Sequence, residues 1–173
     1  MIAVADTGPL VALAKVNAVD LLTQLYRQVI TSPAVFTEAV TAGLAQAAPD
    51  AEILSAAFTS GRFQVRTPKL ASLPTLSLLH RGEDESIRLA IELRADWLLV
   101  DDLVARRAAL ANFAASGAPA AVKGTLGVVV TAYQQKHLTR QQSIDLVNAL
   151  KARPDVWISD DLCDRVIRTL QTS

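Results

Sequence analysis

Short apolar runs that alternate with helical segments constrain the fold of this chain more than any other feature. Five such runs occur, at residues 2–5, 29–31, 63–65, 97–100 and 121–123. Between them, apolar residues recur at helical spacing, most clearly over residues 83–94. Repeated strand–helix alternation predicts a parallel sheet covered by helices on both faces. We therefore expect a three-layer α/β/α fold with a central parallel sheet of about five strands.

The chain is expected to form a single domain over residues 1–173, because its length fits one domain and no repeat or composition change marks a boundary. Hydrophobic residues make up 51% of it and aromatic residues only 5%, so the core must be mainly aliphatic. Residues 139–173 are expected to be a helical C-terminal extension, two helices joined around Pro154 and Trp157.

Composition excludes several classes of protein. The formal net charge is zero, which argues against a strongly basic nucleic-acid-binding coat but leaves room for a local basic patch. Cys163 is the only cysteine, so no intrachain disulfide can form, and with only His80 and His137 besides, a zinc site is not expected. The sequence shows no signal peptide and no apolar run of about 18 residues. A cytoplasmic protein without membrane contact is expected.

Acidic residues follow two of the apolar runs directly. Asp6 comes after residues 2–5, and Asp101 and Asp102 come after residues 97–100. Ligands of parallel sheets bind outside the carboxyl ends of the strands, so these acids would meet if their strands are neighbours. Carboxylates brought together repel one another unless a cation neutralises them. Mg²⁺ or Mn²⁺, which prefer oxygen ligands, is the expected cofactor.

Further acids lie on the adjoining helices. Glu38 interrupts an apolar surface, and Glu83 and Glu85 stand at the start of the helix after Gly82. Residues two apart on a helix differ by about 200° in direction, so at most one of Glu83 and Glu85 is expected to face a site.

Each of these residues also has a purely structural interpretation. Asp6 suits a turn, Asp101 and Asp102 suit a helix cap, residues 83–85 suit a helix N-terminus, and Glu38 suits a solvated helix face. Their joint placement favours a functional site. In the same way, Arg106 and Arg107 follow Asp102 by about one helical turn and suit either phosphate contacts or a solvated basic face.

Four motifs in order carry a family resemblance: DTGPL from residue 6, GEDESI from residue 82, LLVDD from residue 98 and GTLG from residue 124. The chain resembles PIN-domain proteins, and most closely the VapC-like toxin subfamily, over roughly residues 1–135 and arguably the tail. Ser86 departs from the usual alanine of the second motif, and Asp84 leaves the choice within residues 83–85 open.

The resemblance implies a metal-dependent endoribonuclease, the toxin of a type II toxin–antitoxin pair, that cleaves RNA, forms a homodimer and binds a small antitoxin. The mean hydropathy of +0.29 agrees with a dimer. It implies catalytic roles for Asp6, Glu38, Glu85 and Asp102, metal binding by Asp6, Asp102, Glu85 and Asp101, and substrate contacts by Thr125 and Arg106.

Two other functions fit parts of the sequence. The alternative is a non-catalytic PIN-fold interaction module, but the retained acids argue against it. A Rossmann-type nucleotide-binding protein is disfavoured, because neither G-x-G-x-x-G after the first strand nor a Walker motif occurs.

Overall fold

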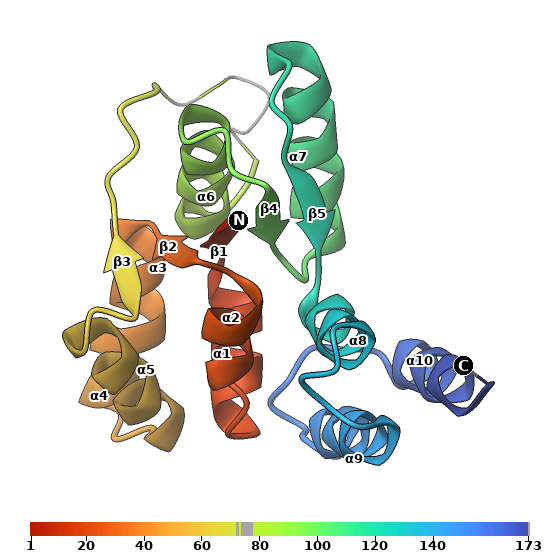
Figure 1. The fold of residues 1–173 in the computed structure, drawn as a ribbon. Helices are drawn as coiled ribbons and strands as arrows, with labels where there is room; N and C mark the ends of the chain where they lie inside the picture. The colour runs from red at the N-terminus through yellow and green to blue at the C-terminus, as the bar shows by residue number, and fades with distance from the viewer. Residues whose placement is uncertain (72, 74–77, 173) are drawn as a thin grey trace.

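The computed structural model of the protein describes residues 1–71, 73 and 78–172. In these residues it contains a five-stranded sheet in the order β3-β2-β1-β4-β5, with every neighbouring pair parallel (Figure 1). The strands are β1 (Ile2–Ala5), β2 (Gln28–Thr31), β3 (Phe63–Val65), β4 (Trp97–Leu99) and β5 (Ala121–Lys123). The parallel α/β fold expected from the sequence is confirmed.

Helices cover both faces of the sheet because successive strand residues point to opposite sides. Ala3 and Ala5 pack into one core cluster with α1 (Thr7–Lys15), α2 (Asp20–Leu25), α5 (Pro49–Thr59) and α8 (Thr125–Gln134). Val4 packs into the opposite cluster with α6 (Arg81–Glu92) and α7 (Leu103–Ser116). The inner strands are thus buried on both faces, as their uninterrupted apolar runs predict.

The segment after β2 is helical with one irregular turn. Ser32 caps α3 (Pro33–Phe36) by accepting a hydrogen bond from the Val35 N–H at 3.2 Å, and Pro33 occupies the first turn. A π-helical turn, η1 (Thr37–Ala42), follows and leads into α4 (Gly43–Ala45). Such π turns occur frequently at functional sites, and this one carries Glu38.

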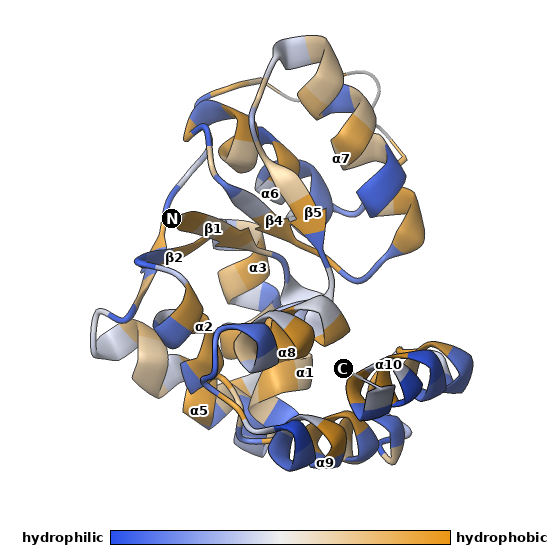
Figure 2. Cartoon of the chain, turned by 45° about the vertical axis from the view of Figure 1, so that its right-hand side comes forward, coloured by the Kyte–Doolittle hydropathy of each residue, from blue (hydrophilic) through white to orange (hydrophobic). Residues whose placement is uncertain are grey.

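The C-terminal segment forms α9 (Arg140–Lys151) and α10 (Asp160–Thr172), which pack with α8 around a third apolar cluster that includes Val147, Cys163 and Leu170. Both helices mix hydrophobic and hydrophilic residues (Figure 2). The two expected helices are therefore present, joined by the segment that contains Pro154 and Trp157.

Apolar residues at helical spacing from Leu10 to Leu25 predict helix, and the structure has α1 and α2 there, with Asn17 at φ 54° between them. The glycines at residues 124 and 127 predict a turn, but residues 125–127 are the start of α8, with Gly124 at its N-cap position. The predicted loop at residues 67–74 includes positions 72 and 74, which lie outside the described residues. None of the described helices is long and apolar enough to cross a membrane.

Candidate active site

The centre of the sheet is the point where the strand order reverses. β1 and β4 lie side by side, with Val4 opposite Leu98, although they are far apart in sequence. The Asp6 N–H continues this pairing with a 2.9 Å hydrogen bond to the Leu99 carbonyl oxygen. From there β1 leads into α1 on one face and β4 leads towards α7 on the other. A crevice at such a switch point is the usual ligand site of an open parallel sheet.

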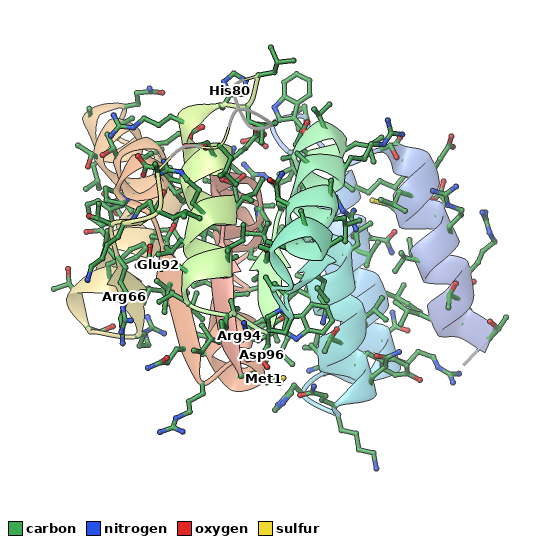
Figure 3. All side chains as sticks on the ribbon, turned by 90° about the horizontal axis from the view of Figure 1, so that it is seen from above. Met1, Arg66, His80, Glu92, Arg94 and Asp96 are labelled. Carbon is green, nitrogen blue, oxygen red and sulfur yellow. The ribbon has the colours of Figure 1, made fainter. Side chains whose placement is uncertain are left out.

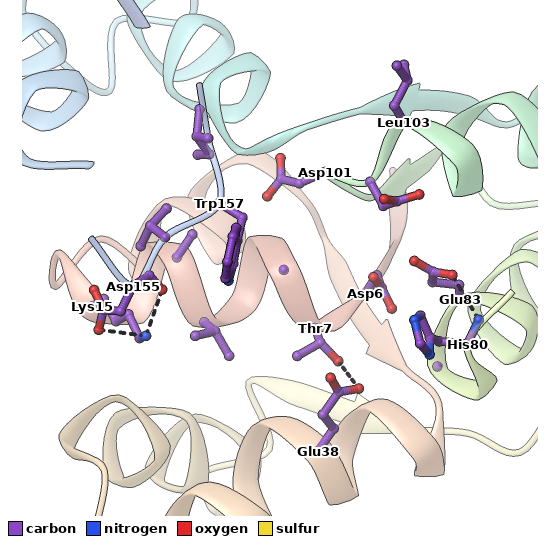
Figure 4. A pocket seen from close by; sticks show the side chains of 17 residues that line it. Asp6, Thr7, Lys15, Glu38, His80, Glu83, Asp101, Leu103, Asp155 and Trp157 are labelled. Atoms are coloured by element: carbon purple, nitrogen blue, oxygen red, sulfur yellow. Dashed lines mark hydrogen bonds and ion pairs between the residues drawn. The ribbon is translucent and has the colours of Figure 1, made fainter. Parts of the chain in front are cut away.

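A cavity of about 640 Å³ lies at this edge. Figure 3 shows His80, which lines it, on the opposite side of the molecule from Met1 and Asp96, which precede β1 and β4. The cavity is therefore at the carboxyl ends of the strands. The acids that line this end of it are Asp6, Glu38, Glu83, Asp101 and Asp102, and we call them the carboxylate cluster (Figure 4).

Asp6 is the most perturbed member of the cluster. Asp6 is only 8% exposed, although its side chain is ionisable. Burial, with the added repulsion of Glu83, Glu38 and Asp101, raises the pKa of Asp6 to about 7. The Thr7 backbone opposes this shift without cancelling it. In the described part of the chain Asp6 forms no salt bridge, so a buried acid without an ion-pair partner lines the cavity.

Asp101 and Asp102 follow β4 but have different surroundings. Thr125 holds Asp101 from the N-terminus of α8, donating from its backbone N–H at 2.7 Å and its hydroxyl at 2.5 Å. Burial nevertheless raises the pKa of Asp101. Asp102 accepts the Ala105 N–H at 2.8 Å and caps α7, so its structural interpretation is correct while it also lines the cavity.

Glu38 reaches the cluster from η1. Thr7, at the start of α1, donates its hydroxyl hydrogen to Glu38 Oε2 at 3.0 Å. A Cβ placed on Gly82 would lie 3.5 Å from both Asp6 Oδ1 and Glu38 Oε2. Asp6 and Glu38 therefore approach the same position of the α6 backbone, while the tightest contact of such a Cβ would be with Val35 Cγ2 at 3.2 Å.

The structure brings Glu83, and not Glu85, to the cavity. Glu85 accepts hydrogen bonds from the Ala34 N–H at 3.0 Å and from Arg81 Nε at 2.8 Å, away from the cluster. Although burial opposes them, these bonds lower the pKa of Glu85. Glu83 accepts the His80 N–H at 3.0 Å, lines the cavity, and has its pKa raised by burial. Glu83 and Glu85 are two residues apart on α6, and their side chains therefore have different surroundings.

The sequence contains a signal that separates the three acids of α6. Arg81 lies four residues before Glu85, and Arg88 lies four residues after Asp84, the spacing of helical ion pairs. Both pairs form, at 2.8 Å and 2.6 Å. Glu83 has no basic residue at that spacing, so it remains available for the site.

Neither of the two residues expected to contact the substrate lines the first cavity. Thr125 is fully buried and has no surface to offer a substrate, since its hydroxyl is directed at Asp101. Arg106 lines a second cavity beside the carboxylate cluster. His80 and Trp157, which line the first cavity, were not among the residues proposed from the sequence.

The chemistry of the cluster suits a hard divalent cation. All its donors are carboxylate oxygens, the atoms that Mg²⁺ and Mn²⁺ prefer. No member forms a salt bridge with a basic side chain in the described part of the chain. Arg106 near Asp101 and His80 near Glu83 lower the pKa of those acids only in part, because burial still raises both. As the side chains lie, no three acids, histidines or cysteines among the described residues form a ready metal-binding group. Binding would therefore draw the carboxylates closer together.

Comparison with known families agrees with this architecture. The profile described as a PIN domain matches residues 2–172, nearly the whole chain. The comparisons with curated proteins and with solved structures found no match.

Proposed function

The chain belongs to the PIN domain family, and from that premise we propose that it is a metal-dependent endoribonuclease that cleaves single-stranded RNA. The observation that carries the proposal is the position of Asp6 and Asp101 at the ends of the adjacent strands β1 and β4. Glu38 and Glu83 complete a cluster of acids that forms no salt bridge with the described residues. Such a cluster is unfavourable for stability, which is typical of a site that binds a cation.

In the proposed mechanism Asp6, Asp101 and Asp102 would hold the ion, and Glu38 and Glu83 would line the rest of its site. A bound divalent cation lowers the pKa of water and offsets charge that develops on the scissile phosphate. The remaining work falls to side chains of this chain. Thr125 fixes Asp101 through two hydrogen bonds, Thr7 fixes Glu38, and the carboxylate oxygens orient the attacking water. Glu83 takes the role that the family resemblance suggested for Glu85.

The test is cleavage of single-stranded RNA by wild type and Asp6→Asn, each with Mg²⁺, Mn²⁺ or EDTA. We expect cation-dependent cleavage by wild type and a loss of about 100-fold or more in Asp6→Asn, comparable with removing one preorganised electrostatic group. Asp161→Asn, an exposed change on α10, is the matched control and should retain activity. Equal cleavage in every arm would indicate a contaminant, and no cleavage in any arm would favour the non-catalytic interaction module.

We further propose that the protein acts as a VapC-like toxin, as a homodimer regulated by a small antitoxin. The motifs DTGPL, GEDESI, LLVDD and GTLG support this assignment. Exposed apolar residues on α7, Leu103, Val104 and Leu110, supply surface that an assembly would cover. A small DNA-binding protein encoded in the neighbouring reading frame is the expected genetic counterpart, and its co-expression should abolish the ribonuclease activity.

A further inference from the structure

Trp157 is the most exposed large apolar side chain of the described residues, at 96% relative exposure. It lies in the segment between α9 and α10. Its neighbours Val156 and Ile158 pack against the third apolar cluster, and the Ile158 N–H donates a 3.0 Å hydrogen bond to the Val156 carbonyl oxygen, which closes a tight turn with Trp157 at its centre. An exposed tryptophan that its flanking residues hold outward has a surface available for a ligand.

The segment that carries Trp157 is anchored beside the carboxylate cluster. Asp155 pairs with Lys15 of α1 at 2.8 Å and with Arg153 at 2.8 Å, and Arg153 also donates to the Lys15 carbonyl oxygen at 3.3 Å. Trp157 lines the same cavity as Asp6 and Asp101, and Figure 4 shows it between the Lys15–Asp155 pair and Asp101. These ion pairs therefore fasten the segment that carries Trp157 to α1, the helix that follows Asp6.

A second cavity of about 660 Å³ continues from Trp157 between α7, α8 and α10. It shares Asp101, Leu103 and Trp157 with the first cavity. Arg106 of α7 and Arg165 of α10 line it. Neither guanidinium has a hydrogen bond or salt bridge to another described residue. We call this cavity the arginine groove.

We propose that the arginine groove binds a single-stranded polynucleotide, with one base stacked on Trp157 and phosphates at Arg106 and Arg165. This inference rests on the proposed function and specifies how its substrate is held. Aromatic faces accept any unpaired base, and arginines beside them bind the phosphates. A strand held in this way would pass its backbone from the groove across Trp157 towards the carboxylate cluster, because the two cavities share Trp157 and Asp101.

The groove also has apolar lining, including Leu126, Leu162 and Val166, which would suit a peptide helix. Two observations favour a polynucleotide. Arg106 and Arg165 form no salt bridge with another described residue, and they lie in different elements on the two sides of the groove, Arg106 in α7 near Asp101 and Arg165 in α10. Trp157 stands where the groove meets the acids that the reaction needs. The experiments below distinguish a peptide bound in the groove from a polynucleotide.

The experiment measures binding without cleavage. A fluorescein-labelled single-stranded RNA of about 12 nucleotides, within the size range of such sites, is titrated in EDTA and followed by polarisation. Trp157→Leu should weaken binding by about 5- to 150-fold, the range for losing one stacked base, and Trp157→Phe should restore most of it. The same strand annealed to its complement should bind wild type and Trp157→Leu equally, because paired bases hide their faces.

Arginine variants test the groove separately. Arg165→Ala should weaken binding and lower the slope of log Kd against log salt by about one, as the loss of one phosphate contact does. Arg168→Ala, on the same helix but outside the groove, is the matched control. Trp157 emission should also be quenched by RNA in wild type. The only other tryptophan, Trp97, lies under Lys123 at 3.7 Å, so the quenching should disappear in Trp157→Phe.

Several outcomes would overturn the inference: unchanged RNA binding by Trp157→Leu, equal losses for single strand and duplex, or a Phe variant as weak as the Leu variant. A Trp157→Leu protein that binds RNA normally but fails to bind a co-expressed small protein would assign the groove to a peptide. Because binding is measured without a cation, failure of cleavage leaves this result intact. Conversely, normal cleavage with binding independent of Trp157 would refute the stacking role alone.

Discussion

At the scale of single residues, the site depends on one buried acid. Asp6 is 8% exposed and its pKa is raised to about 7 from an ordinary value of 3.8. A carboxyl group with a raised pKa binds its proton more tightly in the folded state than in the unfolded state. Its ionisation therefore opposes folding. The loss of stability begins above about pH 3.8 and is complete above about pH 7.

We expect Asp6→Asn to stabilise the cation-free protein, and to stabilise it more at pH 8 than at pH 5. The asparagine side chain is neutral at both pH values, whereas the wild-type carboxylate is ionised in the folded protein only at the higher pH. Thermal unfolding in EDTA of wild type and variant measures the difference in Tm. Mn²⁺ should reduce this difference in Tm, because the ion binds the ionised carboxylate cluster and so stabilises the folded wild-type protein.

Asp161→Asn, exposed on α10, is the control for a change of net charge and should shift Tm equally little at both pH values. A lower Tm for Asp6→Asn without metal, or the same gain at pH 5 and pH 8, would contradict an uncompensated carboxylate at residue 6.

At the scale of elements, α6 separates acids with different tasks. Glu85 joins α6 to α3, because its carboxylate accepts the Ala34 N–H at 3.0 Å at the N-terminus of that helix. The accompanying pair with Arg81 adds little, since the arginine side chain is 81% exposed. Glu83 instead turns to the cavity. One turn of helix thus contributes both a structural and a candidate functional carboxylate.

We expect substitutions at these two positions to have opposite consequences. Glu85→Ala should lower the free energy of unfolding by about 1–3 kcal/mol, because it leaves the Ala34 N–H without its charged acceptor, and should retain cleavage per folded molecule. Glu83→Gln should retain or raise stability but lower cleavage by about tenfold or more. Denaturant unfolding and RNA cleavage measure the two effects. If Glu85→Ala loses activity while Glu83→Gln keeps it, the assignment drawn from the cavity lining is wrong.

At the scale of the whole molecule, the strand order 3-2-1-4-5 decides where the chemistry can occur. β1 and β4 are neighbours, so Asp6 and Asp101 meet at the reversal point, while α9 and α10 supply the segment that places Trp157 beside them. The C-terminal segment therefore does more than extend the domain, because the connection between α9 and α10 lines both cavities and α10 lines the second.

We expect the protein to dimerise at micromolar concentration, because Leu103, Val104 and Leu110 leave an apolar surface on α7. Sedimentation of wild type and Val104→Glu should show a dimer that the substitution converts to a monomer. Leu44→Glu, an exposed apolar position on α4, is the matched control. A wild-type protein that stays monomeric at all micromolar concentrations would remove the dimer from the proposal.

The features that the sequence predicted are local. The short apolar runs predicted the strands, and their alternation with helical segments predicted a parallel sheet, and both are confirmed. These properties depend on residues within about ten positions of one another, so they can be derived from periodicity and capping. The acids that follow β1 and β4 were named for the same reason.

Which of these residues lie close together depends on the tertiary structure. The adjacency of β1 and β4 depends on pairing between distant segments, which no local pattern encodes. The spacing of Arg81 and Glu85 suggests an ion pair, but the acceptance of the Ala34 N–H by Glu85 depends on how α3 packs against α6. The sequence places Trp157 between two helices, and its position beside Asp101 arises only when α10 packs with α8. Convergence of side chains is a property of packing, and packing depends on contacts across the whole chain.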